Sequence, residues 1–205
     1  MNLALEVHDL TCIRGQRVLF RVLNFSVRSG ALLCVEGPNG AGKTSLLRLI
    51  AGLLRPAAGT IRLRTDTGTV ADSEERGAFV GWLGHQDAVK PQMTVHEQLS
   101  FFAQIYQSSH PSEEALEAFG LASLAEVPGQ FLSAGQKRRL ALARLMLCGR
   151  PLWLLDEPLA ALDAAGKKLV AESIRAHCAS GGVAMAATHE PLALPCETLR
   201  LGTLP

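Results

Sequence analysis

The stretch Gly37-Pro-Asn-Gly-Ala-Gly-Lys-Thr44 matches the pattern G-x-x-x-x-G-K-[ST]. It follows a continuous apolar run at 31–36, and the segment after it, up to Leu54, carries apolar residues at helical spacing. We therefore expect a strand, a phosphate-binding loop and a helix, in this order. The glycines allow backbone N–H groups to curl around a phosphate without obstruction from a Cβ atom, and the helix N-terminus then faces the anion. The alternative is a glycine-rich turn that binds nothing.

The residue types in this loop suit a nucleotide triphosphate bound together with Mg²⁺. Lys43 can reach the terminal phosphates, and the Thr44 hydroxyl can ligate an Mg²⁺ ion that bridges the same oxygens. The N-K-x-D pattern that reads guanine does not occur in the sequence, so ATP is the expected nucleotide. The residues expected to contact it are Gly37, Pro38, Asn39, Gly40, Ala41, Gly42, Lys43, Thr44 and Ser45.

Two adjacent carboxylates follow a second buried strand. The sequence there reads Trp153-Leu-Leu-Asp-Glu-Pro158, and a parallel sheet would place its acidic end beside the phosphate loop. Asp156 would hold the hydrated Mg²⁺, and Glu157 would polarise the attacking water as a general base. Phosphoryl transfer to water is therefore favoured over transfer to a substrate hydroxyl. An acidic turn that only caps the strand is the alternative.

The order of the remaining segments predicts an α/β protein. Three short pieces near the N-terminus have the pattern of antiparallel strands, and the block from Thr94 to Ala125 is helical, with Pro111 opening a new helix. Alternating strands and helices predict a parallel sheet covered by helices, with ligands at the carboxyl ends of its strands. The expected strands are Ala4 to Val7, Arg17 to Phe20, Val22 to Val27, Thr60 to Arg64, Ala78 to Leu83, Leu152 to Leu155 and Val183 to Ala187, and a further helix is expected from Ala134 to Cys148.

The stretch Leu132-Ser-Ala-Gly-Gln136 opens this last expected helix. Ser133 and Gln136 have the spacing of an S-x-x-Q capping box. With the small residues Ala134 and Gly135 in its first turn, the helix N-terminus is also a second anion site, although one nucleotide needs only one phosphate loop. If two such chains faced each other, one nucleotide could contact the phosphate loop of one chain and this helix N-terminus of the other.

Together these residues resemble the nucleotide-binding subunits of ATP-binding cassette (ABC) transporters, whose signature usually reads LSGGQ. Ala134 departs from it by one methyl group. The resemblance covers essentially the whole chain and includes Gln86, the loop Ala161-Leu162-Asp163 and the pair Thr188-His189. It implies a P-loop NTPase (RecA-like) fold, in which a parallel-sheet core carries an antiparallel β subdomain and an inserted α-helical subdomain. The expected organisation is a single nucleotide-binding domain, with the core at 1–86 and 138–205 and the helical signature subdomain at 87–137.

The same resemblance implies roles for individual residues. Gln86 would link the metal and the attacking water to the helical insertion, and His189 would contact the γ-phosphate; taken alone, both would more commonly be ordinary polar loop residues. The implied catalytic residues are Lys43, Gln86, Glu157 and His189, and the implied Mg²⁺ ligands are Thr44, Gln86 and Asp156. The opposite protomer would add Ser133, Gly135 and Gln136 to the nucleotide site.

One departure concerns the base of the nucleotide. Members of this family usually place an aromatic residue near Gly15 to stack on adenine, but the sequence there reads Cys12-Ile13-Arg14-Gly15. Arg14 or Ile13 takes that place, and an arginine can stack its guanidinium plane on a base. We therefore expect looser recognition of the base.

Composition limits the possible classes. The chain of 205 residues is 48% hydrophobic, and its 20 Lys and Arg nearly balance 19 Asp and Glu, which argues against a disordered protein and against binding of nucleic acid. Its five cysteines are odd in number, far apart in sequence and without a C-x-x-C pair, so we expect a reducing cytoplasmic compartment, with neither a disulfide framework nor a zinc site. Without a long apolar stretch or a signal peptide, the chain is expected neither to cross a membrane nor to be exported.

The resemblance implies that a nucleotide-binding subunit as short as this chain works with a membrane partner. The helix expected from Thr94 has a stripe of large apolar side chains that suits either docking to such a partner or core packing within the helical insertion, which is the commoner use. The stripe consists of Leu99, Phe101, Phe102, Ile105 and Tyr106. A mean hydropathy of +0.18 is high for a free-standing domain and agrees with a partner surface.

Finer detail resembles the ATPases of the cytochrome c maturation system, which are short chains. The similarity lies in Gly84-His-Gln86 with Lys90 and Thr94 following, in the signature and its continuation through Lys137-Arg-Arg139, and in Ala141-Leu-Ala-Arg-Leu145. It implies the cytoplasmic face of a bacterial inner membrane, a CcmB-like integral-membrane subunit, and haem-handling partners like CcmC, CcmD and CcmE. Two alternatives remain open: an ABC transporter ATPase for another substrate, and a soluble regulatory ABC protein.

Overall fold

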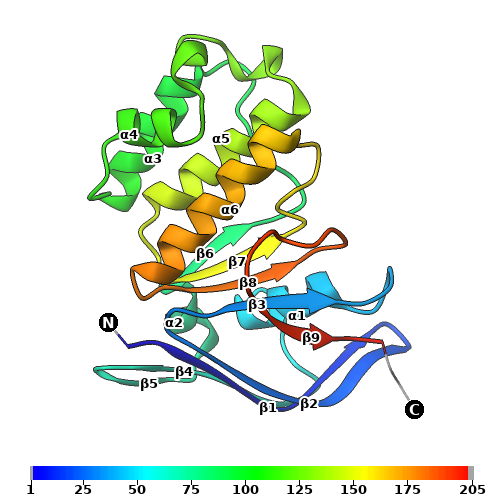
Figure 1. Ribbon diagram of the computed structural model, residues 1–205. Helices are drawn as coiled ribbons and strands as arrows, with labels where there is room; N and C mark the ends of the chain where they lie inside the picture. The colour runs from blue at the N-terminus through cyan, green and yellow to red at the C-terminus, as the bar shows by residue number, and fades with distance from the viewer. Residues whose placement is uncertain (1, 203–205) are drawn as a thin grey trace. The chain divides into compact units, whose positions relative to one another are not determined.

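The computed structural model describes residues 2–202, and the chain divides into two compact units (Figure 1). The first, the core unit, contains the chain up to Trp82, then Arg150–Asp156, and the chain from Ile174 onward. The second, the helical unit, contains Leu83–Gly149 and Glu157–Ser173. Asp156 and Glu157 are joined by one peptide bond but belong to different units.

An antiparallel sheet in the core unit has the strand order β2-β1-β4-β5. Where three short strands were expected near the N-terminus, two long strands form a hairpin, because Val22, at φ 50°, is accommodated as an irregularity inside one of them. Between the two strands expected at Thr60 to Arg64 and at Ala78 to Leu83, the chain also forms the short strand β5 and the helix α2, Ser73–Gly77, which Asp72 caps. The strands are β1 (Ala4–Arg14), β2 (Arg17–Arg28), β4 (Ala58–Thr65) and β5 (Gly68–Val70).

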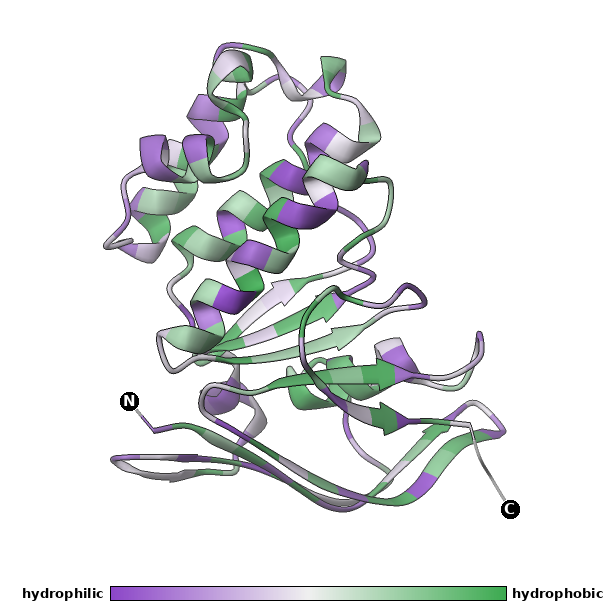
Figure 2. Cartoon of the chain, in the orientation of Figure 1, coloured by the Kyte–Doolittle hydropathy of each residue, from purple (hydrophilic) through white to green (hydrophobic). Residues whose placement is uncertain are grey.

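The second sheet of the core unit has the order β6-β7-β8-β3-β9, and the pairs β7–β8 and β8–β3 are parallel, as expected; β9, which the sequence did not predict, pairs in parallel with β3. Its central strands are hydrophobic along almost their whole length (Figure 2), which suits burial on both faces. Asp156 pairs with Ala187, and Ala187 pairs with Val35, so the carboxyl ends of β7, β8 and β3 lie side by side. The strands are β3 (Leu32–Glu36), β6 (Val80–Leu83), β7 (Leu152–Asp156), β8 (Val183–Ala187) and β9 (Glu197–Arg200).

Helix α1, Lys43–Ile50, follows the phosphate loop, and its apolar face belongs to one continuous core with residues of both sheets. The helix was expected to reach Leu54 but ends at Ile50, because Gly52 has a left-handed φ of 78° and the backbone N–H groups of Gly52 and Leu53 donate back to the carbonyl oxygens of Leu49 and Arg48. Arg76 of α2 is buried, and its Nε donates to the carbonyl oxygen of Ile50 at 3.0 Å while Nη2 donates to that of Leu49 at 3.3 Å. Arg76 therefore acts as a C-terminal cap of α1.

The second Nη of the same guanidinium connects α1 to the antiparallel sheet. Nη1 of Arg76 donates to the carbonyl oxygen of Ala71 at 2.8 Å and to that of Ile61 in β4 at 3.3 Å. Burial lowers the pKa of Arg76, and the nearby Asp72 carboxylate opposes this shift; the guanidinium nevertheless keeps its charge, as arginines in proteins do. One buried cation thus satisfies carbonyl groups from three segments of the core unit.

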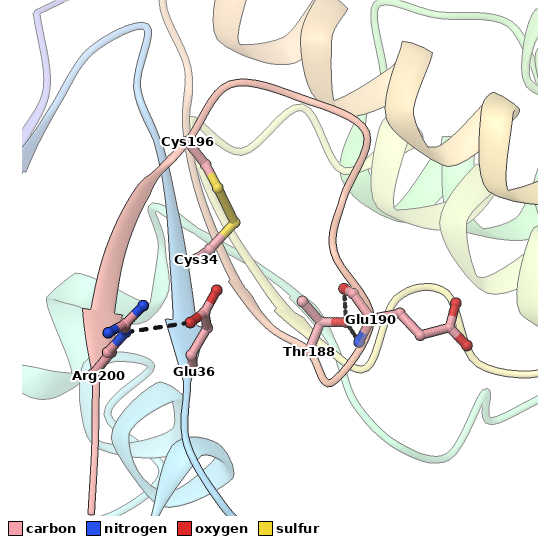
Figure 3. The surroundings of a disulfide bond; sticks show 6 residues. All are labelled: Cys34, Glu36, Thr188, Glu190, Cys196 and Arg200. Carbon is pink, nitrogen blue, oxygen red and sulfur yellow. Dashed lines mark hydrogen bonds and ion pairs between the residues drawn. A yellow bond between two sulfur atoms is a disulfide. The ribbon is translucent and has the colours of Figure 1, made fainter. Parts of the chain in front are cut away.

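Two of the five cysteines form a disulfide, and our expectation from the sequence was wrong for this pair. Cys34 of β3 is bonded to Cys196, which directly precedes β9, across a separation of 162 residues (Figure 3). Parallel pairing of β3 with β9 places the two cysteines near each other, at a Cα–Cα distance of 6.1 Å, although they are far apart in sequence. Beyond the disulfide, Arg200 of β9 forms an ion pair with Glu36 at 3.6 Å.

The helical unit is built mainly from α3, α4 and α5. Helix α3 begins after Thr94, which forms a capping box with Glu97, and ends at Gln107, whose φ of 49° is left-handed. Pro111 is the N-cap of α4, so the prediction that it opens a new helix is confirmed. The elements are α3 (Val95–Tyr106), α4 (Ser112–Ala118), the 3₁₀ turns η1 (Ala122–Leu124) and η2 (Gly129–Phe131), α5 (Ala134–Leu147), and α6 (Ala164–Ala179), which begins in this unit.

We predict that Arg76→Met lowers the free energy of unfolding by roughly 3 kcal/mol or more, because buried carbonyl groups lose their donors at once. The measurement is urea denaturation followed by tryptophan fluorescence, and both tryptophans, Trp82 and Trp153, belong to the core unit. Arg48→Met is the matched control, since Arg48 is exposed in the last turn of the same helix. Equal midpoints for the two variants would contradict the capping role of Arg76.

Candidate nucleotide site

The phosphate loop leaves β3 at Glu36 and enters α1 at Lys43, as expected. Its glycines have left-handed backbone angles, with φ of 147° at Gly37 and 102° at Gly42, the N-cap of α1. Gly37 also has no room for a side chain, because a Cβ atom there would lie 2.5 Å from the carbonyl oxygen of Leu201. The backbone angles at both positions and the lack of room at Gly37 therefore favour glycine in this loop.

Lys43 and His189, 146 residues apart in sequence, meet in this loop. The buried Lys43 Nζ donates to the carbonyl oxygens of Gly37 at 2.7 Å and Pro38 at 3.3 Å, and it lies 3.1 Å from Nε2 of His189. Since an ammonium group can only donate, Nε2 of the ring accepts, which places the ring proton on Nδ1. The first residue of α1 and the residue that follows β8 by two positions thus bring a cation and an imidazole to one point of the loop.

Thr44 and Asp156 form the second contact at this edge of the sheet. The Thr44 hydroxyl lies 3.0 Å from both carboxylate oxygens of Asp156, the last residue of β7, which is buried. The sequence predicts that these two side chains share a metal ion. A hydroxyl and a carboxylate at this distance are the oxygen ligands that Mg²⁺ prefers, so the residues present fit that ion.

In the helical unit, the signature stretch forms the expected helix start. Ser133 is the N-cap of α5: its hydroxyl accepts from the backbone N–H of Gln136 at 3.2 Å, and its own N–H donates to the Gln136 side chain at 2.7 Å, so the predicted capping box is confirmed. Gly135 lies against the loop at Ala161, whose carbonyl oxygen would be 2.8 Å from a Cβ atom. Ser133 itself is exposed.

Gln86 and Glu157 also belong to the helical unit, whereas Lys43, Thr44, Asp156 and His189 belong to the core unit. Gln86 is exposed in the loop after β6. Glu157 is half-buried and has a left-handed φ of 50°, which is uncommon for a residue with a side chain.

Three arginines near these groups were not assigned a role from the sequence. In the core unit, Arg17 lies opposite Arg14 in the hairpin of β1 and β2, and an Nη of Arg17 lies 3.6 Å from where a Cβ of Gly40 would be. Cross-strand pairs of like charge are unfavourable, and this pair lies beside the expected anion site. In the sequence, the short spacing of Arg14 and Arg17 around the Gly15 turn is a signal that could have identified this pair of arginines.

The other two arginines, Arg138 and Arg144, come from α5 and hold the loop that carries Gln86. Arg144 donates to the carbonyl oxygens of Asp87 and Ala88, the latter at 2.8 Å, and its guanidinium lies over the ring of Phe102 at 5.1 Å. Burial lowers the pKa of Arg144, which still keeps its charge. For Arg138, the only signal in the sequence is its place in the basic run Lys137-Arg-Arg139.

The apolar stripe of α3 is divided between the interior and the surface of the helical unit. Leu99 is fully buried, whereas Phe101 is 48% exposed and Ile105 is 56% exposed, and Tyr106 is also exposed. Packing within the unit therefore accounts for Leu99 but leaves the end of the stripe uncovered. Among residues 2–202, no helix combines the length and the apolar character that crossing a bilayer requires.

A family model described as "ABC transporter" matches residues 20–160, a span that contains the phosphate loop, the signature and the Asp156–Glu157 pair. The chain belongs to the ABC transporter family. It is similar to a solved "Putative ABC transporter (ATP-binding protein)" from Pyrococcus furiosus, with a TM-score of 0.82 and 25% identity over 97% of both chains. The expected P-loop NTPase fold, with its antiparallel β part and inserted helices, is thereby confirmed.

Curated relatives are similar over nearly the whole chain. The "Cytochrome c biogenesis ATP-binding export protein CcmA" of Rhodopseudomonas palustris (strain BisB5) is 46% identical over 200 residues, which are 97% of this chain and 98% of the relative. The protein of the same name from Bradyrhizobium diazoefficiens is 47% identical and covers 93% of this chain and 94% of its own length. The chain is therefore an ATP-hydrolysing subunit of the ABC type.

Proposed function

We propose that this chain is the ATP-hydrolysing motor of an ABC transporter complex that serves c-type cytochrome biogenesis, where it drives haem export or the release of a haem chaperone. The observation that carries the proposal is the near full-length similarity to relatives named for cytochrome c biogenesis. Residues 1–205 act in it as a single nucleotide-binding domain. Two alternatives are an ABC ATPase for another substrate and a soluble regulatory ABC protein.

In this proposal the loop Gly37–Ser45 binds the phosphates of ATP, and the ammonium group of Lys43 donates to phosphate oxygens. Its contacts to two backbone carbonyl groups support this role, because they place the ammonium group within the loop. Thr44, Asp156 and Gln86 would hold Mg²⁺. The ion would neutralise charge on the phosphate oxygens.

Hydrolysis requires a base for the attacking water, and we assign this role to Glu157. Its carboxylate follows the Mg²⁺ ligand Asp156 directly, so the two adjacent side chains would divide metal binding and proton abstraction between them. His189 would contact the γ-phosphate, and its place beside Lys43 Nζ supports that role. Gln86 would position the attacking water.

The signature helix α5 would act on the nucleotide of a second copy of the chain. Ser133 is exposed at an N-terminus whose first turn contains no acidic side chain, and the helix dipole there favours an anion. Ser133, Gly135 and Gln136 of one protomer would thus face the phosphates bound by Lys43 of the other. ATP would then hold two protomers together.

The membrane partner would be a CcmB-like integral-membrane subunit, associated with haem-handling proteins like CcmC, CcmD and CcmE. The exposed side chains Phe101, Ile105 and Tyr106 support a partner on α3. The motor would lie peripherally on the cytoplasmic side of a bacterial inner membrane. Recovery of the native protein wholly in the soluble fraction, without a membrane protein, would favour the regulatory alternative.

We predict that Glu157→Gln preserves binding of ATP and Mg²⁺ but lowers the turnover number by about 100-fold or more, because the base is lost while the site remains. Lys43→Ala should instead weaken nucleotide binding itself. Titration with a fluorescent ATP analogue and steady-state release of phosphate separate the two effects. Normal turnover of the Glu157 variant would refute the assignment of the base.

A second prediction concerns assembly. The Glu157→Gln variant retains its ATP and should therefore sediment as a dimer with ATP and Mg²⁺ and as a monomer without nucleotide. Sedimentation velocity measures this directly, and Ser133→Glu in the same background should abolish the dimer by placing a negative charge against the phosphates. A monomer under every condition, with or without the membrane subunit, would argue against the shared site.

The third prediction tests the biological role. In a strain that lacks the gene or carries Lys43→Ala, covalent c-type cytochromes should disappear while b-type cytochromes persist, because only the former need haem delivered and attached. A haem stain of denatured membrane and periplasmic fractions detects covalent haem alone, and an immunoblot checks the abundance of the variant. Undiminished c-type bands in a confirmed deletion strain would leave an ABC ATPase for another cargo.

A further inference from the structure

Arg138 is a buried cation in the helical unit to which the proposed function gives no role. It lies in the second turn of α5, five residues after the N-cap Ser133, and its side chain is only 3% exposed. A guanidinium in the interior is costly unless its N–H groups find acceptors. The acceptors of Arg138 therefore indicate which parts of the chain it holds together.

One nitrogen of Arg138 binds both ends of the short loop that carries Gln86. Nη1 donates to the carbonyl oxygen of Gly84 at 2.8 Å and forms an ion pair with the Asp87 carboxylate at 2.9 Å. Gly84 precedes Gln86 by two residues, and Asp87 follows it directly. Gln86 itself is exposed, and Arg138, together with Arg144, contacts the residues on either side of it.

The other terminal nitrogen binds the backbone of Glu157. Nη2 of Arg138 donates to the Glu157 carbonyl oxygen at 2.6 Å. Glu157 has a left-handed φ of 50°, and such a conformation persists only where the surroundings hold it. The hydrogen bond fixes the peptide that follows Glu157 and so restricts the backbone from which its carboxylate extends.

We propose that Arg138 is a positioning residue for ATP hydrolysis. Its guanidinium holds the backbone of Glu157 against the loop of Gln86, and its Cα belongs to the helix that Ser133 begins. The geometry of the base therefore depends on the position of the signature helix. This inference rests on the proposed role of Glu157 as the general base.

The first test compares Arg138→Met with Arg139→Met in steady-state ATP hydrolysis. Arg139 is a matched control, because it lies on the same helix and also donates to two carbonyl groups, those of Phe119 and Gly120 at 3.1 Å. Arg138→Met should lower kcat about 10- to 100-fold, the loss that a small misplacement of a catalytic group causes. KM for ATP should change little, since Lys43 and its loop belong to the core unit, and Arg139→Met should keep its kcat.

A role in stability alone is separated by combining the variant with Glu157→Gln. If Arg138 acts through the base, the double variant should hydrolyse ATP in a long single-turnover experiment no more slowly than Glu157→Gln alone. Urea denaturation of each variant reports the stability. Arg138→Lys should recover part of the lost kcat, because an ammonium group keeps the charge and can still donate to one of the three acceptors.

The outcomes distinguish this inference from the function on which it rests. If Glu157→Gln hydrolyses ATP normally, the assignment of the base fails, and this inference fails with it. If Glu157→Gln is inactive but Arg138→Met keeps its kcat, only this inference fails. A loss of rate from Arg138→Met that multiplies fully with that of Glu157→Gln would also overturn it.

Discussion

The parallel pairing of β7, β8 and β3 is the constraint on which the nucleotide end of the core unit depends. Because Asp156, Ala187 and Val35 share one register, the chain leaves all three strands at the same edge of the sheet. The segments that follow them carry the phosphate loop and His189, while Asp156 itself ends β7. A change of register by one residue would turn Asp156 to the opposite face of the sheet and separate it from Thr44.

Buried arginines that donate to backbone carbonyl groups are the second organising feature, and both units use it. Arg76 receives little help from carboxylates and instead holds carbonyl groups of α1, β4 and the segment before α2. In the helical unit, the buried Arg138 and the half-buried Arg144 donate to carbonyl groups of the loop after β6, and Arg138 also forms an ion pair with Asp87. A guanidinium suits this task because its donors form a planar fork that can meet several fixed acceptors at once.

The features that the sequence predicted correctly depend on neighbours along the chain. The capping box of Ser133 and Gln136 and the left-handed glycines of the phosphate loop are set by residues a few positions apart, and the alternation of buried strands with helices gave the parallel sheet. The features that the sequence did not predict depend on residues far apart in the chain. The last carbonyl groups of α1 are bound by Arg76, 26 residues beyond Ile50, and the bond between Cys34 and Cys196 follows from a pairing of β3 with β9 that their spacing did not reveal.

The cap on α1 has an electrostatic consequence for its opposite end. A helix carries partial positive charge at its N-terminus and partial negative charge at its C-terminus, and each end can be neutralised by a nearby ion. In α1, which has only eight residues, the negative end is already compensated by the buried Arg76, while no acidic side chain occupies the first turn. The partial negative charge of α1 is therefore compensated, while the partial positive charge at its N-terminus, beside the phosphate loop, is not compensated by a side chain of the helix itself. The protein's own carboxylate at this end is the buried Asp156, 3.0 Å from the Thr44 hydroxyl, and the remaining positive charge of the helix N-terminus favours a phosphate in the loop.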